Sequence, residues 1–149
     1  MVRRKMLIAI IAAVAVFGAA CSSDATEPTT TVPATTIPTE IPDLEFGSGD
    51  VPFTVPTGFP VPDSAVVGST MIDGVNGRTE MNINFPATVE EVVDFYEINL
   101  PARGFVVVLS KGTETEWNIS HEKDGTEGVI RLIQQGSSVS AGSFSFDHS

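Results

Sequence analysis

The chain has 149 residues, which allows one domain of ordinary size. Its formal net charge is −11, but three of its eight basic residues are Arg3, Arg4 and Lys5, whereas all 19 acidic residues follow Cys21. The chain from Cys21 onward therefore has five basic and 19 acidic residues, a net charge of −14. A surface this acidic repels nucleic acid and anionic lipid headgroups, so neither is expected to bind it directly. The single cysteine excludes an intrachain disulfide.

The first 20 residues have the order of a signal peptide. Three positive charges precede residues 6–20, an uncharged run of 15 residues that ends in small side chains before Cys21. The run is shorter than the roughly 18 apolar residues that a membrane-spanning helix needs. We therefore predict that residues 1–20 are a signal peptide that directs export.

The residues at the predicted cleavage site, Gly18-Ala19-Ala20-Cys21, resemble the lipobox of bacterial lipoproteins. Gly18 departs from that motif, in which leucine, valine or isoleucine is usual. The resemblance implies that the Cys21 thiol is acylated and that the lipid holds the protein at the extracytoplasmic face of the cell membrane. Two alternatives remain open: ordinary cleavage, which would release a soluble protein with a free thiol, and an uncleaved helix.

A linker and an extended arm are expected before the folded domain. Residues 21–43 contain seven threonines and four prolines, a composition too polar to bury a core, so we predict a disordered linker there. It resembles the Thr/Pro stalks of actinobacterial envelope proteins. Residues 44–58 alternate prolines with apolar side chains, which predicts an arm packed on the domain, with an edge strand near Phe53. Residues 59–149 are predicted to form one small α+β domain.

A hairpin is predicted at the start of this domain. Residues 65–72 have a strand-like composition, with a possible bulge at Gly68. Residues 73–77 are rich in glycine, asparagine and aspartate, which favours a turn. Residues 79–85 then alternate apolar and polar side chains, which is typical of a half-buried strand.

A helix is predicted to follow the hairpin. Thr88 and Glu91 have the spacing of a capping box, which indicates that the helix begins there. Gly104 is expected to end it in a Schellman motif, with Phe105 packing back on Leu100. The apolar stripe expected to face the core consists of Val89, Val92, Val93, Tyr96 and Leu100.

More strands are predicted in the rest of the chain, at residues 105–109, 116–122, 128–134 and 139–146. The first of these is apolar throughout, as in a central strand. Short connections favour antiparallel neighbours. The predicted fold class is therefore α+β: an antiparallel sheet of about five to six strands, with one helix packed on one face, in the order β-β-α-β-β-β.

Two segments of this domain resemble a recurrent small domain of bacterial lipoproteins. They are Phe59-Pro-Val-Pro-Asp-Ser-Ala65 and the helix end Phe95-Tyr96-x-x-x-Leu100-Pro101-x-x-Gly104-Phe105. The likeness spans residues 59–147. Because its motif residues describe a turn and a helix end, and because that domain has no known function, the resemblance implies no activity.

The sequence lacks the residue patterns of a catalytic or metal site. Its two histidines, His121 and His148, have neither the number nor the spacing of zinc ligands, and no cofactor is predicted. Ser120 precedes His121, but neighbours on a strand point to opposite faces and cannot form a nucleophile–base pair. We expect His121 to be solvated at a strand end and His148 to lie in a frayed tail.

Trp117 and His121 are the candidate partner-binding residues, because lone tryptophans often mark contact sites. Burial of Trp117 in the core is the alternative interpretation. The function expected from anchor, linker and domain is a non-catalytic module that binds or positions an envelope protein or a wall component. The alternatives are a small envelope enzyme with a site of scattered carboxylates and His121, and an accessory wall- or ligand-binding lipoprotein of a transporter.

Overall fold

The computed structural model describes residues 40–149, which belong to one compact unit. The predicted signal peptide, the predicted lipidation site at Cys21 and the linker up to residue 39 lie outside the described residues. The helix that the structure describes is too short to cross a membrane.

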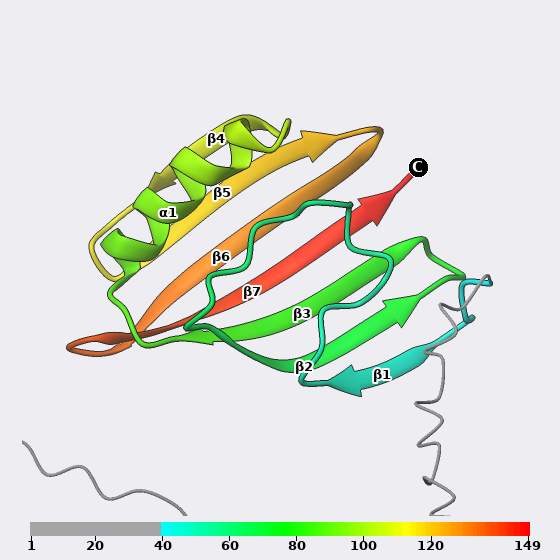
Figure 1. Cartoon of the computed structure of the whole chain (residues 1–149), viewed down its shortest axis with the longest axis horizontal. Helices are drawn as coiled ribbons and strands as arrows, with labels where there is room; N and C mark the ends of the chain where they lie inside the picture. Colours follow the sequence, from blue (N-terminus) through cyan, green and yellow to red (C-terminus); the bar gives the residue numbers. More distant parts are fainter. Residues whose placement is uncertain (1–39) are drawn as a thin grey trace, which may run out of the picture. The chain divides into compact units, whose positions relative to one another are not determined.

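Residues 40–149 form a seven-stranded antiparallel sheet with one helix, α1, packed on one face (Figure 1). The α+β class is confirmed, but the sheet has seven strands rather than five to six. The elements, in chain order, are β1 (Glu45–Ser48), β2 (Val66–Asp73), β3 (Arg78–Phe85), α1 (Val89–Ala102), β4 (Val106–Gly112), β5 (Glu116–Lys123), β6 (Thr126–Gly136) and β7 (Val139–His148).

The strand order β1-β2-β3-β7-β6-β5-β4 places the last strand in the middle of the sheet. After β3, the chain crosses one face of the sheet as α1 and then forms β4 at the opposite edge. Hairpins connect β4 to β5, β5 to β6 and β6 to β7, and β7 pairs with β3. The apolar run at residues 105–109 was expected to be a central strand, and this expectation is wrong. Because the chain passes through α1 after β3, this run forms the edge strand β4, in which Val106 and Val108 are exposed.

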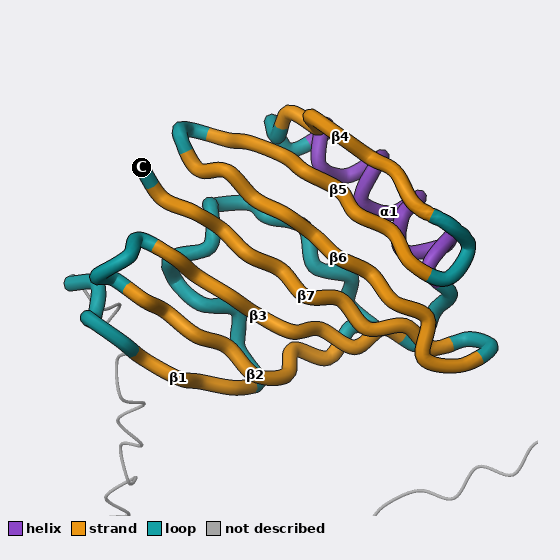
Figure 2. The backbone as a smooth tube through the Cα atoms, turned by 180° about the vertical axis from the view of Figure 1, so that it is seen from behind, coloured by secondary structure: helices purple, strands orange, loops and turns teal. Residues whose placement is uncertain are grey.

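Alternation along the strands gives the sheet one buried face and one open face. In β3, Met81, Ile83 and Phe85 are buried, as the sequence pattern predicted. Phe144 and Phe146 of β7 lie on the same buried face. Figure 2 shows the other face, which no helix or loop of residues 40–149 covers.

Both predicted ends of α1 are confirmed. Thr88 and Glu91 form a capping box, in which the Glu91 carboxylate accepts from Thr88 N at 2.8 Å. Phe105 N donates to Leu100 O at 3.0 Å, and Gly104 N donates to Pro101 O at 3.0 Å, which together form a Schellman motif. The predicted apolar stripe is buried in full: Val89, Val92, Val93, Tyr96 and Leu100.

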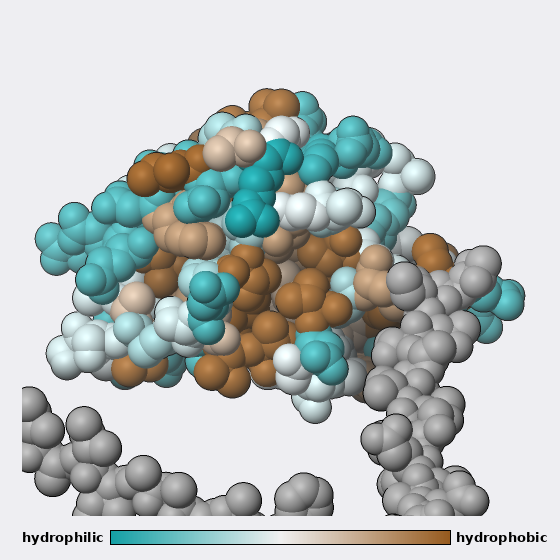
Figure 3. Space-filling model, in the orientation of Figure 1, coloured by the Kyte–Doolittle hydropathy of each residue, from teal (hydrophilic) through white to brown (hydrophobic). Residues whose placement is uncertain are grey.

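An arm of residues 49–65 crosses the sheet on the same face as α1 (Figure 1). Val55 and Phe59 belong to the buried core, so the arm packs on the rest of the domain. The edge strand expected near Phe53 is instead β1, and residue 53 lies in a turn. Figure 3 shows hydrophobic surface in the middle of this face, and the exposed apolar side chains of the arm are Val51 and Phe53.

Two backbone carbonyls of the arm are held by basic side chains. Lys123 Nζ donates to Thr57 O at 2.7 Å, and Arg103 Nη1 donates to Gly58 O at 3.4 Å. Lys123 comes from β5 and Arg103 from the C-cap of α1. The arm is therefore tied to both layers of the domain, to the sheet and to the helix.

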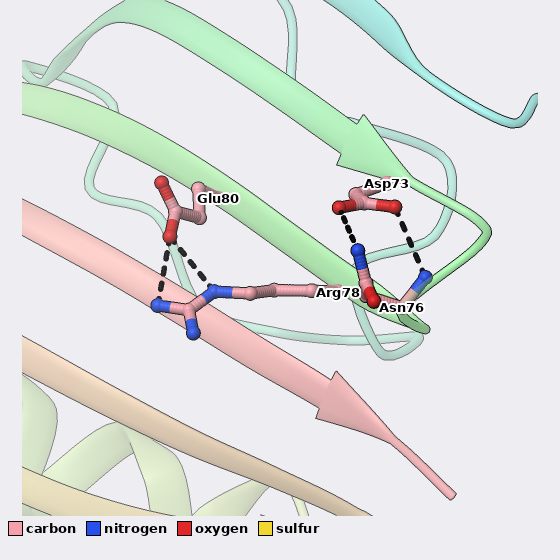
Figure 4. A network of polar contacts seen from close by, with 4 residues as sticks. All are labelled: Asp73, Asn76, Arg78 and Glu80. Atoms are coloured by element: carbon pink, nitrogen blue, oxygen red, sulfur yellow. Dashed lines mark hydrogen bonds and ion pairs between the residues drawn. The ribbon is translucent and has the colours of Figure 1, made fainter.

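The turn between β2 and β3 is built on polar contacts (Figure 4). Asp73 accepts from the backbone and side-chain nitrogens of Asn76 at 3.0 and 2.7 Å, and these hydrogen bonds lower the pKa of Asp73. Arg78 pairs with Glu80 at 2.8 Å.

The chain before β1 also contacts this turn. Gly74 N donates to Pro42 O at 3.1 Å, and a β-carbon at residue 74 would stand 2.4 Å from that oxygen. Pro42 was predicted to lie in the linker, but this contact attaches it to the folded unit. The close approach requires glycine at position 74.

Gly104→Val should lower the free energy of unfolding by about 1–2 kcal/mol. Gly104 has a φ of +82°, which a β-branched residue rarely adopts, and no atom lies near its missing β-carbon, so the cost is conformational rather than steric. Gly136→Val is the control, because Gly136 has the same open space without a positive φ. Chemical denaturation measures both; equal stability of the two variants would contradict the helix end described here.

Candidate functional site

A groove of about 340 Å³ lies between the first half of α1 and the turn that joins β4 to β5, at the left of Figure 1. Its apolar members are Val89 and Val93, both buried, and Trp117, which is half-buried. Its exposed members are Glu90, Asp94, Glu97, Thr113 and Glu114. The groove thus combines an apolar interior with an acidic rim.

The helix supplies three of the four carboxylates. Glu90, Asp94 and Glu97 are spaced four and three residues apart, so they lie on one side of α1. The sequence pattern placed these residues on the solvent side of the helix. It did not indicate that Trp117 and Glu114 lie opposite them, because this depends on how α1 packs against β5.

Hydrogen bonds fix the orientation of the Trp117 ring. Trp117 Nε1 donates to Ser110 Oγ at 2.8 Å, and Ser110 Oγ donates to the Glu97 carboxylate at 2.7 Å. This chain connects β5, β4 and α1 across the groove. The indole and one carboxylate are therefore held in place before any ligand arrives.

The candidate residue Trp117 lies in the groove and packs against the core without being fully buried. Glu114 lies on the rim, but Glu116 faces the other side of the sheet and pairs with Arg131 at 3.6 Å. The groove therefore gathers Glu90, Asp94, Glu97 and Glu114, but it includes neither Glu116 nor His121.

His121 is buried rather than solvated, which corrects the expectation from the sequence. Its side chain is 2% exposed and packs among the rings of Phe59, Phe105 and Phe146, with centroid distances of 5.4–5.8 Å. Neither ring nitrogen has a hydrogen-bond partner within residues 40–149. The ring adjoins a surface pocket with Ser120, Gly128 and Val129, although almost none of it is exposed.

His148 also differs from the expectation, since it lies in β7 and not in a frayed tail. Its Nε2 is 3.2 Å from Thr79 Oγ1, and its Nδ1 is 3.3 Å from Thr126 Oγ1. Each ring nitrogen of His148 is thus within hydrogen-bond distance of a threonine hydroxyl group on a neighbouring strand.

Within residues 40–149, no group of three or more histidine, cysteine, aspartate or glutamate side chains has the geometry of a metal site. No protein-family model matches the chain, and no curated protein or solved structure is significantly similar to it. The groove beside Trp117 is therefore the feature of residues 40–149 that bears on function.

Burial makes His121 a source of acid sensitivity. Desolvation lowers the pKa of His121 from 6.5 to about 4, so between these values the unfolded chain binds more protons than the folded one. Stability should therefore fall as the pH decreases from about 6.5 towards 4, by up to about 1.4 kcal/mol per pH unit.

His121→Phe should remove this part of the pH dependence, because phenylalanine does not titrate and suits an aromatic environment. Denaturant unfolding of both proteins at a series of pH values measures the two slopes. An identical slope in wild type and variant between pH 6.5 and 4 would show that His121 is accessible to protons in the folded state.

Proposed function

We propose that this chain is a lipid-anchored, non-catalytic binding module of the cell envelope, and that the groove beside Trp117 is its recognition site. In this proposal the lipid on Cys21 holds the protein at the extracytoplasmic face of the membrane. The Thr/Pro-rich linker extends the domain away from the membrane, towards an envelope protein or a wall component.

The observation that carries the proposal is the combination of features in the groove. An aromatic ring held by hydrogen bonds and a charged rim beside it are typical of a recognition site. The groove is open and small, which suits contact with part of a larger molecule better than enclosure of a solute.

The burial of His121 speaks against the enzyme alternative, which assigned that residue a catalytic role. A general base must come within hydrogen-bond distance of the proton that it removes. Phe59 and Phe105 cover the His121 ring, and the hydroxyl of Ser120 points to the other sheet face.

The anchor can be tested by intact-mass analysis of the membrane fraction. We expect the mature protein to begin at Cys21 and to carry additional mass on the order of two or more acyl chains. Cys21→Ser should move the protein from the detergent phase into the soluble fraction. Unmodified Cys21 at the N-terminus of a protein in the culture medium would contradict the lipid anchor.

The recognition site can be tested by photocrosslinking in intact cells. A benzoylphenylalanine at Thr113, on the rim of the groove, should give a discrete adduct with an envelope component. The same group at Ser143, which is exposed on the open face of the sheet, is the matched control. Trp117→Ala in the Thr113-labelled protein should weaken the adduct.

Two outcomes would count against this site. Adducts of equal strength from Thr113 and Ser143 would indicate non-specific proximity, and an adduct insensitive to Trp117→Ala would show that the groove is not used. Deleting residues 24–39 should also abolish the adduct by shortening the reach of the domain. That deletion spares Pro42, whose carbonyl binds the turn at Gly74.

A further inference from the structure

The rim of the groove carries negative charge that the described part of the chain does not neutralise. Only five basic residues follow Cys21, and all of them lie within residues 40–149. Arg78 and Arg131 pair with carboxylates outside the groove, and Arg103 and Lys123 hold the arm. Lys111 neighbours Ser110 on β4 and so points to the opposite face of the sheet.

The Trp117 ring favours an apolar group in the same ligand. The half-buried indole offers apolar surface beside the carboxylates, whereas Val93 is 6% and Val89 0% exposed. Lysine and arginine side chains have this composition, an aliphatic stem with a cationic head. A cation near an indole ring gains further from the electrostatic attraction of the ring face.

The spacing of the carboxylates favours a ligand with more than one cation. Along the helix, Glu90 and Asp94 are separated by a rise of about 6 Å, and Glu97 lies about 4.5 Å further on. In an extended peptide, side chains two residues apart on one face are separated by about 6.8 Å. An extended segment with basic residues at alternate positions therefore matches the rim.

We propose that the groove beside Trp117 binds an extended, lysine- or arginine-containing segment of a partner protein. The inference rests on the proposed function, because it names the ligand class of the same groove. The apolar stems pack on the Trp117 indole and the small exposed part of Val93, and the cationic heads lie among Glu90, Asp94 and Glu97. Charge attraction brings the segment to the domain, and the apolar interior selects its side chains.

The chain offers a direct probe, because Trp117 is its only tryptophan. The probe ligand is an acetylated, amidated peptide in which one glycine separates two lysines. We expect this peptide to change Trp117 emission with saturation, and raised salt to weaken the binding. A peptide with norleucine in place of lysine keeps the stem, lacks the charge and should not bind.

Two pairs of variants distinguish the effect of charge in the groove from the effect of the overall charge of the domain. Glu90→Gln with Asp94→Asn should weaken binding of the lysine peptide by about tenfold or more. Glu122→Gln with Glu127→Gln removes the same charge from exposed positions outside the groove and should leave the affinity unchanged within about twofold. Equal weakening by both pairs would mean diffuse attraction to an acidic protein and would overturn the proposal.

The remaining outcomes distinguish this inference from the function on which it rests. One outcome is that the norleucine peptide binds as well as the lysine peptide, or that no peptide affects Trp117 emission. If Thr113 still gives a crosslink in that case, the basic ligand is wrong and the recognition site stands. If 1,5-diaminopentane binds as tightly as the peptide, the ligand is a small organic cation and the peptide proposal fails. If no peptide affects Trp117 emission and Thr113 gives no crosslink, both the basic ligand and the recognition site are wrong.

Discussion

The packing of one phenylalanine from the arm joins the parts of this domain. The ring of Phe59 lies within 5.0–5.9 Å, centroid to centroid, of the rings of Tyr96, Phe105, His121, Phe144 and Phe146. These residues come from the helix, its C-terminal end, β5 and β7. A single sheet with one helix leaves part of its apolar face uncovered, and the arm closes that part. Lys123 of β5 donates to the carbonyl of Thr57, and Arg103 at the end of α1 donates to the carbonyl of Gly58. These two hydrogen bonds hold the arm to the sheet and to the helix.

Features set by short stretches of sequence could be predicted well. The capping box at Thr88, the glycine end at Gly104 and the alternating face of β3 depend on residues close in the chain, and the structure has all three. The bulge at Gly68 also appears, as a register shift between Val67 and Thr70. In each case, the preference of the local sequence agrees with the overall fold.

Features set by distant contacts could not be predicted in the same way. The apolar composition of residues 106–109 suits a central strand, but only the path of the chain through α1 shows that β4 is an edge. His121 was expected to be solvated, but its burial depends on Phe59, more than sixty residues earlier. The groove is a similar case, because the turn at Thr113 and the helix meet only after both have packed on the sheet.

The central position of β7 has a consequence for how the domain is made. Without its last strand, the sheet would consist of two separate parts, β1-β2-β3 and β6-β5-β4, with no backbone hydrogen bonds between them. Pairing Arg78 with Asp147 also closes a long loop, and such non-local contacts slow folding. The sheet therefore stays in two parts until β7 has been synthesised. During synthesis, no backbone hydrogen bonds of the sheet can join those two parts before that point.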